Sequence, residues 1–202
     1  MKKALFILLF FSKSIFALTS IEIGTIKGQA SFEKKSLKEG QKIDKKGTIV
    51  VGKGSFLGIK ISEWNAHLTI APGTHLVFNF SPQVLKKIFL KKGSLRWTAL
   101  SNQKNKENKV KTRRGFILTT QSKVIIRGTD FFLKVGHYFE ETEIIVLKGE
   151  VVFQSLQDQN DYSLLKSPRW AGLGGRFGRS IGKPLKLNSQ IKNYYELLLR
   201  FK

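Results

Sequence analysis

Residues 123–153 read KVIIRGTDFFLKVGHYFEETEIIVLKGEVVF, and this stretch decides the fold class. It contains four runs rich in β-branched, aliphatic and aromatic residues, which predict strands. The runs are Val124–Ile126, Phe131–Val135, Ile144–Leu147 and the beginning of a fourth at Val151–Phe153. Glycines lie between or after the runs, at 128, 136 and 149, where they favour turns. The stretch therefore predicts successive short strands joined by tight turns.

The corner Gly128-Thr129-Asp130-Phe131 is the most distinctive part of this stretch. Glycine at its start permits a positive φ, and the threonine hydroxyl can bond a turn amide. Phe131 would anchor the following strand in the core. Turn glycines and core aromatic residues account for this corner in purely structural terms.

The same pattern continues through residues 21–153, where apolar residues alternate with polar ones and turn residues recur every few positions. This period of two predicts an all-β domain of short strands. Glycines precede strands at 54, 73, 93, 115, 128 and 149, and most successive spacings are 19 to 22 residues. Such a repeat fits a solenoid-like stack or a folded-over pair of sheets. A meander with hairpins of similar length would give the same spacing.

The first 17 residues predict a signal peptide, because two lysines precede the apolar run 4–11 and a cleavage site follows Ala17. The alternative is an uncleaved anchor, but Lys13 interrupts the apolar run, which is short for a membrane span. We therefore expect a periplasmic or secreted protein that is not a lipoprotein, with no transmembrane helix in the mature chain. The expected domains are 1–17, a β domain over 18–156, and a basic segment over 157–202.

Composition narrows the function classes. The chain has 202 residues, room for one domain with a core, and no cysteine, which excludes disulfides, thiolate metal sites and thiol catalysis. Its 36 basic and 14 acidic residues give a net charge of +22. A protein this basic associates with polyanions such as anionic lipid, lipopolysaccharide or a wall polymer. Export makes nucleic acid an unexpected partner.

Two segments concentrate the positive charge. Residues 101–114, SNQKNKENKVKTRR, predict a basic loop between strands, and residues 166–186 predict a second loop rich in glycine and arginine. A short C-terminal helix is expected over 190–201, capped at Asn188-Ser189. The candidate anion-binding residues are Lys104, Lys106, Lys109, Lys111, Arg113, Arg114, Arg169, Arg176 and Arg179.

An anion-binding role and a merely solvated surface are both compatible with these charge runs. Binding is favoured by the pairs Arg96-Trp97, Arg169-Trp170 and Arg176-Phe177, because a solubility surface does not need aromatic rings beside its arginines.

Several motifs resemble the FecR domain family of bacterial envelope proteins. The family's Gly-Thr-x-Phe corner is matched by Gly128, Thr129 and Phe131, and its later glycine-led strand by Gly149-Glu150-Val151-Val152-Phe153. Upstream matches are Leu37, Gly40, Ile43, Thr48, Gly52, Ser55, Leu68, Ile70, Pro72, Thr74 and Leu90-Lys91-Lys92-Gly93. The resemblance implies an all-β periplasmic module that contacts other envelope molecules. FecR itself also has a cytoplasmic anti-sigma segment and a membrane helix, so we expect here a free-standing exported FecR domain.

Residues that could carry chemistry are sparse. His67, His75 and His137 lack ligand spacing, and Glu140, Glu141 and Glu143 read as a solvated hairpin end. The glycines around Arg176 are not followed by Gly-Lys-Ser/Thr, and no Gly-x-Ser-x-Gly occurs. We therefore expect no enzyme, cofactor or metal. The expected function is a non-catalytic envelope module that binds an envelope partner and acts in signalling or regulation. The alternative is a polyanion binder using its basic loops.

Overall fold

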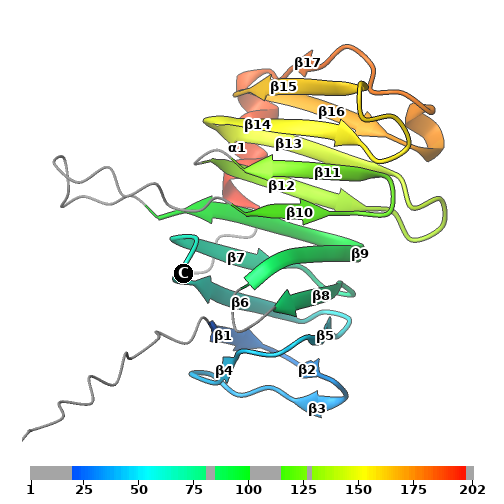
Figure 1. The fold of residues 1–202 in the computed structure, drawn as a ribbon. Helices are drawn as coiled ribbons and strands as arrows, with labels where there is room; N and C mark the ends of the chain where they lie inside the picture. Colours follow the sequence, from blue (N-terminus) through cyan, green and yellow to red (C-terminus); the bar gives the residue numbers. More distant parts are fainter. Residues whose placement is uncertain (1–19, 81–84, 101–114, 127–128, 199–202) are drawn as a thin grey trace, which may run out of the picture.

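The computed structural model describes residues 20–80, 85–100, 115–126 and 129–198. The expected signal peptide at 1–17, the basic loop 101–114 and Gly128 lie outside the described residues. Figure 1 shows the described strands as a stack that runs from β3 at one end to β17 at the other.

The first half of the chain forms nine strands. They are β1 (Ile21–Lys27), β2 (Ala30–Phe32), β3 (Lys35–Ser36), β4 (Lys42–Ile43), β5 (Gly47–Val51), β6 (Phe56–Ile61), β7 (Ala66–Ile70), β8 (His75–Phe80) and β9 (Leu85–Ala99). The alternation of apolar and polar residues predicted these strands, because every second side chain of a strand points to the same face.

The second half forms eight strands, a 3₁₀ turn η1 (Gly175–Phe177) and the helix α1 (Ser189–Leu197). The strands are β10 (Phe116–Leu118), β11 (Ser122–Ile126), β12 (Asp130–Val135), β13 (Thr142–Lys148), β14 (Glu150–Ser155), β15 (Tyr162–Lys166), β16 (Arg169–Leu173) and β17 (Leu185–Lys186). The predicted all-β fold with a short C-terminal helix is therefore confirmed.

The hydrogen-bonded strands form two layers that share β9. Layer A has the order β4-β1-β6-β7-β9-β12-β13-β16-β17, and layer B the order β3-β2-β5-β8-β9-β10-β11-β14-β15. Successive hairpins alternate between layers, so β6–β7 lie in A, β8–β9 begin in B, β12–β13 lie in A and β14–β15 in B. Of the two predicted arrangements, the chain adopts the folded-over pair of sheets.

Strand β9 passes from layer B to layer A at Gly93. Its residues 85–92 pair with β8, whereas Gly93 and the residues after it pair with β12. Gly93 has a φ of 92°, and a Cβ there would lie 2.4 Å from the Thr74 hydroxyl oxygen. Both facts require glycine, because an L-residue rarely adopts this φ and has no room for its side chain.

The inward side chains of both layers form one continuous core. Trp97 lies within it, with its ring centroid 5.7 Å from Trp64 and 6.2 Å from Phe131, and the Phe131 side chain is fully buried. Gly149 has a φ of 77° in the tight turn between β13 and β14. Thr129 is buried, and its hydroxyl has no hydrogen-bond partner among the described residues.

The predicted loop over 166–186 is wrong in part. Strand β16 pairs with β13 from Val146↔Arg169 to Thr142↔Leu173, and β17 pairs with β16. These strands form by pairing with backbone partners distant in sequence. The local sequence is rich in glycine and therefore predicted a loop. Strand β15 likewise continues layer B beyond residue 156 by pairing with β14.

The C-terminal helix is shorter than the predicted 190–201, because Leu198 is already extended (φ −63°, ψ 131°). Its predicted N-cap is confirmed: the Asn188 side chain accepts a hydrogen bond of 2.8 Å from the Ile191 amide. Within the residues that the structure describes, no helix has the length and apolar character needed to cross a bilayer.

Truncation of Phe131 tests the assignment of the core. Phe131→Ala should lower the free energy of unfolding by about 3–5 kcal/mol, because it removes a fully buried ring that stacks on Trp97. Phe139→Ala is the matched control: this ring is 73% exposed, so the loss should stay within about 0.5 kcal/mol. Urea unfolding of both variants measures the difference, and equal losses would place the core elsewhere.

Candidate binding groove beside the C-terminal helix

Helix α1 lies on the outer face of layer A, behind the upper strands in Figure 1. A row of register partners crosses this face from β9 to β16: Arg96, Phe132, Ile145 and Trp170. The aromatic and aliphatic members of this row point away from the main core, and Tyr195 of α1 packs on Phe132 with ring centroids 5.5 Å apart. The helix is thus held partly by a second, smaller apolar cluster.

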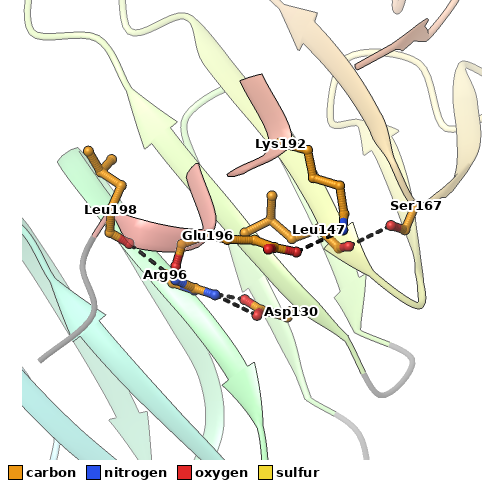
Figure 2. A network of polar contacts seen from close by, with 7 residues as sticks. All are labelled: Arg96, Asp130, Leu147, Ser167, Lys192, Glu196 and Leu198. Carbon is orange, nitrogen blue, oxygen red and sulfur yellow. Dashed lines mark hydrogen bonds and ion pairs between the residues drawn. The ribbon is translucent and has the colours of Figure 1, made fainter. Parts of the chain in front are cut away.

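Arg96 fixes the C-terminal end of this helix (Figure 2). Its guanidinium makes two bonds to the Asp130 carboxylate, Nε to Oδ1 at 2.9 Å and Nη2 to Oδ2 at 2.7 Å. Nη1 donates to the backbone carbonyls of Glu196 and Leu198. The last carbonyls of a helix lack partners within the helix, so the arginine satisfies two of them from an adjacent strand. Arg96 is 5% exposed, and this network therefore joins helix and sheet in a largely dry setting.

A groove of about 380 Å³ lies between α1 and strands β13, β16 and β17. Its apolar lining includes Ile145, Trp170, Leu187, Ile191 and Tyr195. Polar groups line it as well, from Glu143, Lys186 and Asn188. An apolar surface with a few polar groups is typical of binding sites for ligands and partner side chains.

The Glu143 carboxylate organises one side of the groove. It accepts a hydrogen bond of 2.7 Å from the Trp170 indole nitrogen and lies 3.7 Å from an Arg176 guanidinium nitrogen. Phe177 packs edge-on against Trp170 with ring centroids 5.4 Å apart, and Arg176 stacks over the Phe177 ring. Gly172 is required beneath this group, because a Cβ there would lie 2.4 Å from the Phe177 ring. The indole orientation is therefore fixed from two sides.

The expected anion-binding residues fall in different places. Arg176 meets Glu143, Arg169 donates a hydrogen bond of 3.4 Å to the Pro184 carbonyl, and Arg179 is exposed. The six cations between 104 and 114 lie outside the described residues. The Arg176 side chain is 63% exposed, so its ion pair with Glu143 contributes little to stability.

Sequence reasoning missed the groove itself. Glu143 was expected at a solvated hairpin end, yet its side chain is only 15% exposed and bonded to Trp170. Arg96, Trp170 and Tyr195 come from three elements far apart in the chain, and no local pattern brings them together. The sequence feature that could have placed Glu143 is the two-residue period of β13, which puts Glu143 and Ile145 on the same, outer face of the strand.

The groove offers apolar contacts and hydrogen-bonding groups to a ligand. Among the described residues, no three side chains of histidine, cysteine, aspartate or glutamate gather as a metal site. His67 lies on β7 and His75 at the start of β8, in different layers. Burial lowers the pKa of His67, and burial together with the charges of Lys92, Lys91 and His137 lowers the pKa of His75.

No family model matches the sequence, and no curated protein matches it. The fold is similar to two crystal structures of a protein from Parabacteroides distasonis described as a "putative anti-sigma factor". Each has a TM-score of 0.55 and 13% sequence identity over 74% of this chain. The chain spans 63% and 64% of the length of those two chains. At this identity, the likeness shows a common fold.

Replacement of Arg96 tests the network at the helix end. Arg96→Met keeps most of the side-chain volume but leaves the Asp130 carboxylate and two helix carbonyls without their partner. The free energy of unfolding should fall by about 3–5 kcal/mol, and the amides of α1 should exchange faster with solvent. Arg169→Met, which removes one long hydrogen bond, should cost only about 1 kcal/mol. Similar losses in both variants would contradict this role for Arg96.

Titration of Tyr195 tests burial at the groove. Burial, and then the charges of Glu143 and Tyr194, raise the pKa of Tyr195 above its ordinary value of 10.0. In the native protein, its tyrosinate absorbance should therefore appear late in an alkaline titration. Because the folded pKa exceeds the unfolded one, stability should fall as pH rises above about 10. Tyr195→Phe should remove the late component, and Tyr194→Phe should keep it; a late component in Tyr195→Phe would place the buried phenol elsewhere.

Proposed function

We propose that this chain is a non-catalytic binding module of the bacterial cell envelope, related to FecR domains and acting in regulation or signalling. The observation that carries the proposal is the likeness of its fold to the "putative anti-sigma factor", with a TM-score of 0.55 over 74% of the chain. The motif residues Thr129, Phe131 and Gly149 give independent support, because they fill a buried corner and a tight turn of that fold. The proposal takes from the neighbour a regulatory class and no particular partner.

Placement in the envelope belongs to the same proposal. It rests on the charged start and apolar run within residues 1–17, which fit export through a cleaved signal peptide. The exported domain would then act in the periplasm or outside the cell, where other envelope proteins are its available partners.

The groove and the adjoining helix surface are the proposed contact site. Three large apolar side chains of α1 remain exposed: Ile191 (43%), Tyr194 (60%) and Leu197 (69%). Exposed apolar side chains beside a groove are typical of surfaces that another protein covers. A partner side chain in the groove would contact the Trp170 and Tyr195 rings and meet polar groups at Glu143 and Asn188.

A second candidate is a polyanion binder. It is favoured by the charge of 36 basic against 14 acidic residues, and by Arg176, which stacks on Phe177 while keeping 63% of its side chain exposed. Electrostatic binding of exposed charges weakens as salt rises, because charges are screened beyond about 10 Å at 0.1 M ionic strength. Contacts made through the apolar groove would be much less sensitive to salt.

Capture from native envelope extract separates the two functions. Tagged wild-type chain and the variants Leu197→Lys and Leu156→Lys would be incubated with extract, and each sample washed at low and at high salt. Leu197 lies on the exposed surface of α1 that forms part of the proposed contact site, whereas Leu156 follows β14 and is also exposed, so both variants add the same charge at an exposed leucine.

The expected result is one protein that survives the high-salt wash and is lost with Leu197→Lys alone. An anionic polymer or lipid that is lost at high salt would favour the second candidate instead. Capture of neither, or equal capture by both variants, would contradict binding at the groove.

A further inference from the structure

The outer face of layer B carries a continuous apolar row. Phe116, Ile125, Val152 and Leu164 are register partners across β10, β11, β14 and β15. On each of these strands at least one adjacent residue is buried, so these four side chains point outward. The first three are half-buried, and Leu164 is 43% exposed.

A second outward row runs beside the first. Val77, Phe89 and Leu118 are register partners on β8, β9 and β10, and the row continues through Lys123 and Gln154 to Tyr162, which is 63% exposed. Together the rows present eight outward apolar side chains on six neighbouring strands. Large contiguous apolar areas on a protein surface often mark interaction sites. We call these two rows and the lysines among them the apolar-basic face.

Layer A shows what covers such a row in this fold. There Phe132 and Ile145 are 6% and 1% exposed, because α1 lies on them. The apolar-basic face is the opposite outer surface, and α1 lies on the far side of the strands from it in Figure 1. No described element lies on that surface.

The charge on this face has one predominant sign. Lys87, Lys123 and Lys166 point outward from its strands, and the Lys123 ammonium lies 4.9 Å from the centre of the Phe116 ring. Among the described residues of β8–β11, β14 and β15, the outward-pointing acid is Glu150, directly opposite Lys166 at one margin of the sheet. A partner that pairs with the lysines must be acidic as well as apolar.

We propose that the apolar-basic face receives an acidic amphipathic helix of a partner protein, an inference that rests on the proposed binding function. The first row crosses four strands, which at about 4.8 Å per strand spacing spans roughly 14 Å. A helix rises about 1.5 Å per residue, so nine or ten residues cover this row. Helix α1, with nine residues, covers the corresponding row of layer A. The apolar stripe of the partner helix packs on the rows, and its flanking carboxylates meet Lys87 and Lys123.

Two other occupants fit less well. A second copy of this chain carries the same net charge of +22, so its approach to a lysine-bearing face is opposed by like charge. A lipid surface requires side chains that reach about 5–10 Å into the headgroup boundary. Six of the eight apolar side chains here are half-buried between strand neighbours, and the face is a sheet surface without a projecting loop among its described residues.

The test uses the full purified chain and a fluorescent synthetic peptide about three helical turns long. In the first peptide, leucines recur at positions i, i+3, i+4 and i+7, with glutamates on the flanks. A second peptide replaces the glutamates with lysines, and a third scrambles the order of the first. Fluorescence anisotropy at moderate salt should show binding of the first peptide alone.

Matched variants locate the binding. Ile125→Thr combined with Val152→Thr removes apolar contact while keeping residues that favour strands, and should weaken binding about tenfold. Leu185→Thr combined with Leu197→Thr makes a similar change at exposed leucines beside α1 and should leave it unchanged. Lys123→Glu should weaken binding more than Lys53→Glu, which makes the same charge change in the turn before β6. Circular dichroism and melting temperature verify that each variant is folded.

Equal binding of the glutamate and lysine peptides, or loss of binding in the leucine control pair, would overturn the proposal. Dimerisation, or sedimentation with anionic vesicles, that is abolished by the Ile125/Val152 variant would assign the face to a second copy or to lipid and would overturn it too. The peptide experiment needs no envelope extract. A negative result here therefore leaves the groove-based capture standing, and failed capture leaves peptide binding measurable.

Discussion

Strand β9 makes hydrogen bonds with four neighbours, and the two halves of the stack are joined through it. In layer B its first part lies between β8 and β10, and in layer A its last part lies between β7 and β12. The strands before β9 build one end of the molecule and those after it build the other (Figure 1). The passage between layers depends on Gly93. Its positive φ bends the strand, and its lack of a side chain leaves room for Thr74. Trp97, four residues later, then enters the shared core.

The same strand positions the candidate groove. Arg96 precedes Trp97 and points to the opposite face, where Asp130 and the helix carbonyls satisfy its guanidinium. A buried cation is costly unless it is paired and hydrogen-bonded, so this network favours one placement of the helix over others. Trp97 points into the core and Arg96 points outward, so these two residues link the core to the outer face of layer A, which α1 covers. Tyr195 and Leu198 add apolar contacts with Phe132 to that placement.

The predictable part of this structure was what depends on local pattern. The two-residue period identified the strands of 123–153, and Asn188 identified the start of the helix. Strands β16 and β17 were not predicted. Arg169–Leu173 and Leu185–Lys186 form strands because each pairs with a partner outside its own segment. The groove was not predicted for a related reason. Its residues Glu143, Trp170 and Tyr195 belong to a hairpin strand, a later strand and the terminal helix, so no local pattern joins them. Ile125 of β11 and Val152 of β14 point to the outer face, but a two-residue period cannot show which layer a helix will cover.

Alternation of hairpins between the layers has a consequence for how the molecule can assemble. Within a layer, a hairpin bonds to the hairpin before the preceding one, as β11 does with β14 and β13 with β16, so a newly formed hairpin needs only the two hairpins already in place as its template. Each step then closes only a short loop, at a small cost in chain entropy. Folding can therefore start at any hairpin and spread along the stack, as in repeat proteins. The terminal strands β3 and β15 have a neighbour on one side only. Opening should accordingly begin at the two ends of the stack and reach the strands around β9 last.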